Sequence, residues 1–108
     1  MIVKKEKTPS LSALFLRAVL SLESEEECAA FFEDVCTYRE MHDMSQRLQV
    51  ASLLTEGKNY QEISEQTGAS TATISRVNRC LTHGAGGYHT VLSRTEKAKE
   101  QEQEQEQA

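Results

Sequence analysis

The sequence lacks tryptophan and contains one proline, three cysteines and five glycines. The cysteines, Cys28, Cys36 and Cys80, form no Cys-x-x-Cys pair, and their odd number disfavours a disulfide framework. We expect Cys28 and Cys36 to be buried as small hydrophobic residues. The most apolar stretch, residues 11–22, is interrupted by Arg17 and falls short of the roughly 20 apolar residues that a membrane span needs. With no secretory signal pattern at the start, these absences favour a cytoplasmic location.

The size and composition are typical of one small globular domain. The chain has 108 residues and a mass of 12.1 kDa, with 38% hydrophobic and 27% charged residues. Apolar residues show no sustained alternation with period two, so strand signals are absent. We therefore predict an all-α fold of helices joined by short turns.

The net charge of −5 is unevenly distributed along the chain. Residues 11–44 contain two basic and eight acidic residues, whereas residues 45–95 contain five basic and three acidic residues. The overall acidity argues against a nucleic-acid partner, but residues 45–95 combine positive charge with a foldable pattern. That segment is where we expect a partner surface.

Three amphipathic helices are predicted in the first half of the chain. The first follows Pro9, a residue type that favours a helix start. Ser24 with Glu27, and Thr37 with Glu40, predict capping boxes that open the second and third helices. The expected apolar faces are Leu11, Leu14, Phe15, Ala18, Val19 and Leu22; then Cys28, Phe31, Phe32, Val35 and Cys36; then Met41, Met44, Leu48, Ala51 and Leu54.

Two short helices follow the third helix, which we expect to end at Gly57. Asn59 with Glu62 caps a helix of about seven residues that ends before Gly68. Ser70 caps the next helix, which has Ile74, Val77 and Leu81 on one face. Two short helices joined by a turn that contains glycine are typical of a helix-turn-helix.

The helix that Ser70 caps has an opposite face of small, hydroxyl-bearing and cationic residues, and this face carries no carboxylate. Such a face suits a major groove about 12 Å wide, where side chains meet base edges beside a charged backbone. The expected DNA-binding residues are Lys58, Gln61, Ser70, Thr71, Ala72, Thr73, Ser75, Arg76 and Arg79. The alternative is a pair of ordinary amphipathic helices with an exposed Ser/Thr-rich face. Thr71 and Thr73 weigh against it, because β-branched residues are modest helix formers.

Residues 47–54, Gly57 and residues 61–76 resemble the DNA-binding half of the Trp repressor superfamily. The most specific part is Gly68-Ala69 followed by Ala72-Thr73-Ile74-Ser75-Arg76. With residues 28–37 and 77–81, the chain resembles the YerC-like branch of that superfamily. The resemblance implies about six helices and an intertwined homodimer. It also implies that two recognition helices read half-sites of double-stranded DNA about one helical turn apart.

These predictions divide the chain into five segments. Residues 1–9 form a flexible arm, residues 10–57 form helices of the dimer core, and residues 58–83 form the helix-turn-helix. A C-terminal helix occupies residues 84–99. Residues 100–108 form a tail of glutamate and glutamine that has nothing to bury and is expected to be disordered.

The resemblance also implies an effector site. In the Trp repressor, two arginines sandwich the indole of L-tryptophan and a glycine follows the second arginine. Arg76 matches the second arginine, and Arg47 matches the first if one residue is dropped near Asn59. Val77 stands in place of the glycine, and its branched side chain should crowd the ring. This argues against L-tryptophan and leaves open another small-molecule corepressor at Arg47 and Arg76, or a solvated or DNA-contacting Arg76.

The resulting hypothesis is a homodimeric, sequence-specific transcriptional regulator that acts as a repressor. The alternative is a helical protein interaction module that never touches DNA, which the overall acidity favours. No nucleophile and base pairing or phosphate-binding loop is present, so we expect no enzyme. Cys80, His83 and His89 have zinc-like spacing but lack a fourth ligand, so we expect no metal site.

Overall fold

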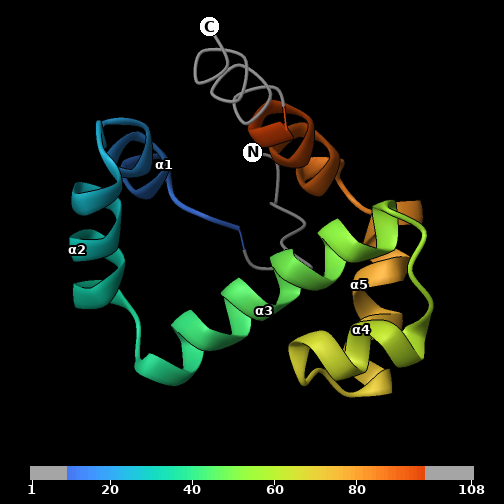
Figure 1. Cartoon of the computed structure of the whole chain (residues 1–108). Coiled ribbons are helices and arrows are strands. Elements are labelled where there is room, and N and C mark those ends of the chain that lie inside the picture. The colour runs from blue at the N-terminus through green and yellow to red at the C-terminus, as the bar shows by residue number, and fades with distance from the viewer. Residues whose placement is uncertain (1–9, 97–108) are drawn as a thin grey trace, which may run out of the picture. The chain divides into compact units, whose positions relative to one another are not determined.

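The computed structural model describes residues 10–96, which form six helices and no strand (Figure 1). The helices are α1 (Ala13–Leu20), α2 (Glu25–Val35), α3 (Tyr38–Thr55), α4 (Tyr60–Thr67), α5 (Thr71–His83) and a sixth helical segment at 87–96. The predicted all-α fold is confirmed. The predicted arm, the end of the last helix and the Glu/Gln tail lie outside the described residues. Within that part of the chain, every helix is too short or too polar to span a membrane.

The chain divides into two compact units between Tyr38 and Arg39. In the first unit, α1 begins at Ala13, because the Ser12 hydroxyl accepts a hydrogen bond from the amide of Phe15 (3.0 Å). The expectation of a helix directly after Pro9 is therefore wrong by several residues.

The start of α2 departs from the predicted capping box in one hydrogen bond. The Ser24 hydroxyl accepts from the amide of Glu27 (3.0 Å), as predicted. The Glu27 carboxylate, however, accepts from the amide of Glu23 (2.8 Å), one residue before the cap. Both amides are satisfied, so the helix still begins where the sequence indicates.

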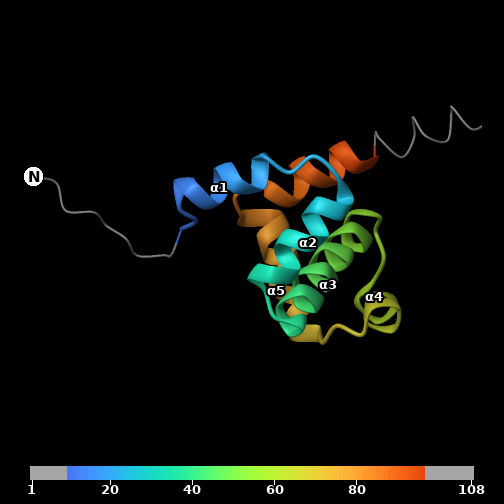
Figure 2. The same ribbon diagram turned by 90° about the vertical axis from the view of Figure 1, so that its left-hand side faces the viewer.

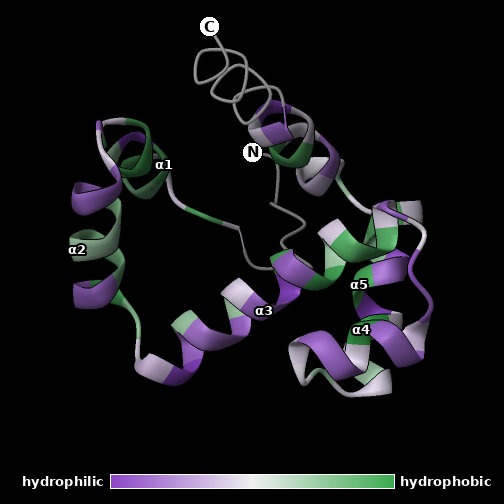
Figure 3. Ribbon diagram, in the orientation of Figure 1, coloured by the Kyte–Doolittle hydropathy of each residue, from purple (hydrophilic) through white to green (hydrophobic). Residues whose placement is uncertain are grey.

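Residues 10–38, the described part of the first unit, contain no buried residue. No residue of α1 or α2 is buried. The rings of Phe15 and Phe31 lie with their centroids 5.7 Å apart. Leu14 is 71% exposed and Leu20 is 83% exposed. Leu20 lies opposite the predicted apolar face, so α1 is hydrophobic on nearly all sides (Figure 3). A helix of this kind is normally buried.

The prediction that Cys28 and Cys36 are buried is wrong. Cys28 is exposed and Cys36 is only half-buried. Cys28 lies at helical spacing from the half-buried Phe31 and Phe32 of α2. Among residues 10–37, however, α1 and α2 are the only helices, so no third helix covers that side of α2.

The second unit contains the hydrophobic core. Its buried residues are Val50, Ala51, Ile63, Ala69, Ile74 and Val77. They come from α3, α4, α5 and the α4–α5 connection, and Leu81, Tyr88 and Leu92 pack against them. Met44 and Leu48, which were expected to face inward, are partly exposed, whereas Val50 is fully buried. The core therefore forms on a side of α3 that the predicted face only partly covers.

The end of α3 and the start of α4 follow the predicted local signals. Gly57 has a φ of +89°. The amide of Gly57 donates to the carbonyl of Leu54 (3.0 Å) and that of Lys58 to Leu53 (3.1 Å), which is a Schellman motif. At the start of α4, the backbone amide of Glu62 donates to the side-chain oxygen of Asn59 (2.8 Å). The Glu62 carboxylate accepts from the backbone amide of Asn59 (2.9 Å). This confirms the capping box.

Candidate nucleic-acid interface

Helices α4 and α5 pack against each other across a three-residue connection at 68–70 (Figures 1 and 2). Gly68 has a φ of +77°, a left-handed conformation that favours glycine, and its amide donates to the carbonyl of Ser64 (2.8 Å). The Thr67 hydroxyl donates to the carbonyl of Ile63 (2.7 Å) and accepts from the amide of Ala69 (3.1 Å). These bonds define a tight helix-turn-helix connection.

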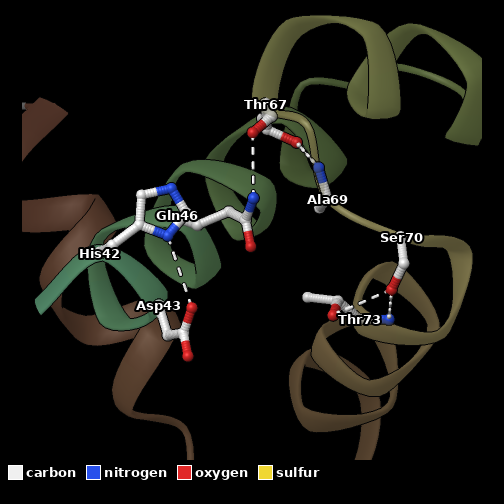
Figure 4. A network of polar contacts seen from close by, with 7 residues as sticks. All are labelled: His42, Asp43, Gln46, Thr67, Ala69, Ser70 and Thr73. Atoms are coloured by element: carbon white, nitrogen blue, oxygen red, sulfur yellow. Dashed lines mark hydrogen bonds and ion pairs between the residues drawn. The ribbon is translucent and has the colours of Figure 1, made fainter. Parts of the chain in front are cut away.

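A side chain of α3 holds this connection in place (Figure 4). The Gln46 amide nitrogen donates to the carbonyl of Thr67 at 3.0 Å, in a partly buried position. That carbonyl belongs to the last turn of α4, where backbone acceptors lack partners within the helix. The bond joins residues 21 positions apart in the sequence. No local sequence signal indicated it.

The inner face of α5 anchors the helix to the core. Ile74 is 0% exposed and Val77 is 2% exposed. Ser70 is the N-cap, because its hydroxyl accepts from the amide of Thr73 (3.2 Å). The Ser70 hydroxyl also donates to the Thr73 hydroxyl (3.2 Å; Figure 4). The Thr73 hydroxyl retains its own hydrogen for a further acceptor.

The outer face of α5, which we define as Thr71, Ala72, Ser75, Arg76, Asn78 and Arg79, points away from the core. All of these residues are exposed except Ser75, which is half-buried. The helix contains no acidic residue. Asn78 was missed by the sequence reasoning. At 100° per residue it lies about 20° from Thr71 on the helix, so a wider face would have included it.

Lys58 and Gln61, the two predicted residues that precede the α4–α5 connection, have different surroundings from the outer face of α5. Lys58 is exposed just before α4. Gln61 is exposed on α4, and its amide nitrogen lies 3.5 Å from the Glu65 carboxylate, to which it donates. An acidic group therefore stands beside Gln61 on α4. The outer face of α5 lacks such a group.

The charges of Arg47 and Arg76, the two arginines that the family resemblance suggests for an effector, both influence the pKa of Tyr88. Arg47 is half-buried on α3, and Arg76 is exposed on α5. Burial raises the pKa of Tyr88 above its ordinary value of 10.0, Cys80 acts in the same direction, and the charges of Arg47 and Arg76 oppose the rise. Tyr88 therefore lies within electrostatic reach of both arginines.

Tyr88 also lines an open, apolar cavity of about 490 Å³. The remaining lining residues are Leu48, Cys80, Gly84, Ala85, Gly87 and Val91. The cavity lies at the C-terminal end of α5. No pattern in the sequence indicated this cavity.

The histidines and Cys80 form no metal site among residues 10–96, where no group of three potential ligands comes together. The Nε2 atom of His89 lies 2.8 Å from the carbonyl oxygen of Leu81. The Nδ1 atom of His42 lies 3.4 Å from the carboxylate of its neighbour Asp43 (Figure 4). These contacts give two of the histidines a structural partner.

Comparison with known proteins identifies the family. The family model described as "Trp repressor protein" matches residues 10–96. The chain is 45% identical over 101 residues to "Uncharacterized protein YerC" of Bacillus subtilis (strain 168), covering 94% of this chain and 96% of that protein.

Solved structures agree with this assignment. A TrpR like protein from Eubacterium eligens ATCC 27750 is 51% identical, with a TM-score of 0.74 over 76% of this chain and 84% of that chain. A structure from Staphylococcus aureus is 47% identical, with a TM-score of 0.75 over 77% of this chain and 83% of that chain. The family is one of regulators rather than enzymes. The protein belongs to the Trp repressor family, in its YerC-like branch.

Proposed function

We propose that this protein is a sequence-specific transcriptional repressor that binds double-stranded DNA as a homodimer in the cytoplasm. The observation that supports the proposal most is the outer face of α5. It is exposed and free of carboxylates, and its opposite side is anchored by the buried Ile74 and Val77. An anchored helix with such a surface suits insertion into the major groove.

Each part of the outer face has a chemical counterpart on DNA. Arg76 and Arg79 each present a guanidinium fork for guanine or phosphate. The Ala72 methyl group suits the methyl group of thymine. The hydroxyls of Ser70, Thr71, Thr73 and Ser75 suit phosphates or base edges, and the first amides of α5 suit a phosphate. Lys58 and Gln61 add contacts to the DNA backbone.

The proposed dimer explains the first unit. Its two helices bury no residue, and two of its large apolar side chains, Leu14 and Leu20, are largely exposed. An exposed apolar patch of this kind marks an interaction surface. A second copy of the chain is the proposed partner, with residues 10–57 forming the shared core. The two α5 helices then lie about 34 Å apart, one turn of DNA.

DNA recognition is testable by selecting bound sequences from a random duplex pool. We expect a palindromic site to emerge, because a twofold dimer presents two equivalent reading helices. Binding of that site should weaken steeply with salt, because each neutralised phosphate releases counterions. Electrophoretic mobility shifts against a scrambled duplex provide the measurement. Equal binding of both duplexes would contradict sequence-specific recognition, and binding of neither duplex at low salt would favour the interaction module.

The dimer is testable with Leu20→Glu. If Leu20 is enclosed between subunits, a carboxylate there loses its hydration twice per dimer, and the dimer dissociation constant should rise by about 100-fold or more. Sedimentation equilibrium measures this constant. Glu25→Gln is the control, since Glu25 is an exposed acidic residue of α2. A Leu20→Glu dimer as stable as the Glu25→Gln dimer would place Leu20 outside the interface.

An effector site at Arg47 and Arg76 is part of the same proposal. The charges of both arginines act to lower the pKa of Tyr88, which lines the apolar cavity. The ligand would be a small molecule with an apolar body and a negative group. L-tryptophan is not proposed, because Val77 occupies the place of the glycine that makes room for its ring.

A further inference from the structure

The helix at 87–96 contacts the end of α5 through one hydrogen bond. The Nε2 atom of His89 lies 2.8 Å from the carbonyl oxygen of Leu81. A carbonyl oxygen only accepts, so Nε2 carries the hydrogen and His89 donates. Leu81 belongs to the last turn of α5, where carbonyls lack an amide partner within the helix. His89 therefore caps α5 from the following helix.

The chain between the two helices has a defined path. The amide of Gly84 donates to the carbonyl of Cys80 (2.8 Å), and a Cβ atom at Gly84 would collide with that carbonyl oxygen. Gly86 adopts a left-handed φ of +88°. The carbonyl of Gly86 accepts from both the amide and the hydroxyl of Thr90, each at 3.1 Å. This turn sets the direction from which His89 meets α5.

The same helix packs on the inner side of α5. Tyr88 and Leu92 lie against the core that contains Ile74 and Val77. Apolar packing is non-directional, so it defines the orientation of a helix less sharply than a hydrogen bond does. A hydrogen bond has a defined length and angle. The bond from His89 therefore adds a directional restraint at the C-terminal end of α5.

We propose that His89 is a positioning residue for DNA recognition, which keeps α5 at the tilt at which its outer face reads the base edges. The inference rests on the proposed function. Hydrogen bonds to base edges weaken steeply when their angle or distance changes. A small tilt of α5 is therefore costly for specific contacts. Charge interactions with phosphates are less directional, so a small tilt of α5 weakens them less.

The test compares His89→Ala with His89→Gln in the full chain, on the duplex selected from the random pool and on a scrambled duplex. His89→Ala should weaken binding of the selected duplex about fivefold per half-site, the size of one net hydrogen bond, and about 25-fold for the dimer. Its affinity for the scrambled duplex and its salt dependence should stay unchanged, because no phosphate contact is lost. His89→Gln keeps an N–H donor at similar reach and should restore the affinity. Amide hydrogen exchange at residues 82–84 should be faster in His89→Ala.

The control is His42→Ala, which removes an exposed histidine whose contact is with its neighbour Asp43. Thermal unfolding identifies a temperature at which every variant is folded. If His89→Ala does not fold, His89→Asn replaces it, since its shorter amide does not reach Leu81.

Four outcomes would overturn the inference. If the wild-type chain binds no selected duplex, the proposed function fails and the inference fails with it. If the wild-type chain binds and His89→Ala matches His42→Ala, only the inference fails. Equal weakening on both duplexes with a lower salt slope would mean that His89 contacts phosphate directly. Failure of His89→Gln to restore affinity would show that the hydrogen bond is not the cause.

Discussion

Replacing Arg79 with glutamate is expected to weaken binding of the selected duplex by about 100-fold or more. Arg79 lies at the centre of the outer face of α5 and is exposed. The substitution removes a guanidinium fork and places a carboxylate against the DNA. Because a dimer presents the residue twice, the loss is counted in both half-sites. Fluorescence anisotropy at two salt concentrations measures the affinity and its salt slope.

Arg94→Glu is the matched control for Arg79→Glu. It makes the same change of charge at an exposed arginine of the helix at 87–96. It should lower affinity only through the general field of the protein, which salt screens. Equal losses in the two variants would show that net charge alone governs binding. The outer face would then not be the reading surface.

Shortening Ile74 to alanine is expected to lower the free energy of unfolding by about 3 kcal/mol. Ile74 is 0% exposed and is part of the core that joins α3, α4 and α5. The substitution removes apolar contacts and leaves a cavity that close-packed neighbours fill only in part. Ile74→Val removes a single methylene group and should cost about 1 kcal/mol. Urea unfolding followed by circular dichroism measures both values.

Thr71→Ala is the control for the core variants, because Thr71 is exposed in the first turn of α5. It should change the free energy of unfolding by less than about 0.5 kcal/mol. All measurements use one protein concentration, since association of subunits adds to apparent stability. An Ile74→Ala variant as stable as Thr71→Ala would mean that Ile74 does not anchor α5.

The helix ends were predictable because their signals are local. The capping box of Asn59 and Glu62, the N-cap Ser70 and the left-handed Gly57 involve residues only a few positions apart. The periodicity of Ile74 and Val77 also identified the inner face of α5 correctly. The outer face then followed as its opposite, with Asn78 omitted because the face was drawn too narrowly.

The N-terminal helices show where periodicity stops being informative. The pattern identified an apolar side of α2, but Cys28 on that side is exposed. Leu20 was assigned to no apolar face and is one of the most exposed leucines of the described chain. A hydrophobic pattern states which side of a helix prefers burial. It does not state which element covers that side, or whether that element belongs to the same chain.

The amino-acid order by itself determined the all-helical class, most helix ends and the carboxylate-free outer face of α5, because each depends on residues within about one helical turn. The tertiary structure decided the rest. It placed Val50 rather than Met44 in the core, set Gln46 on the end of α4, and brought His89 to Leu81. Such contacts depend on how whole helices pack after the intervening chain has closed, which no local pattern specifies.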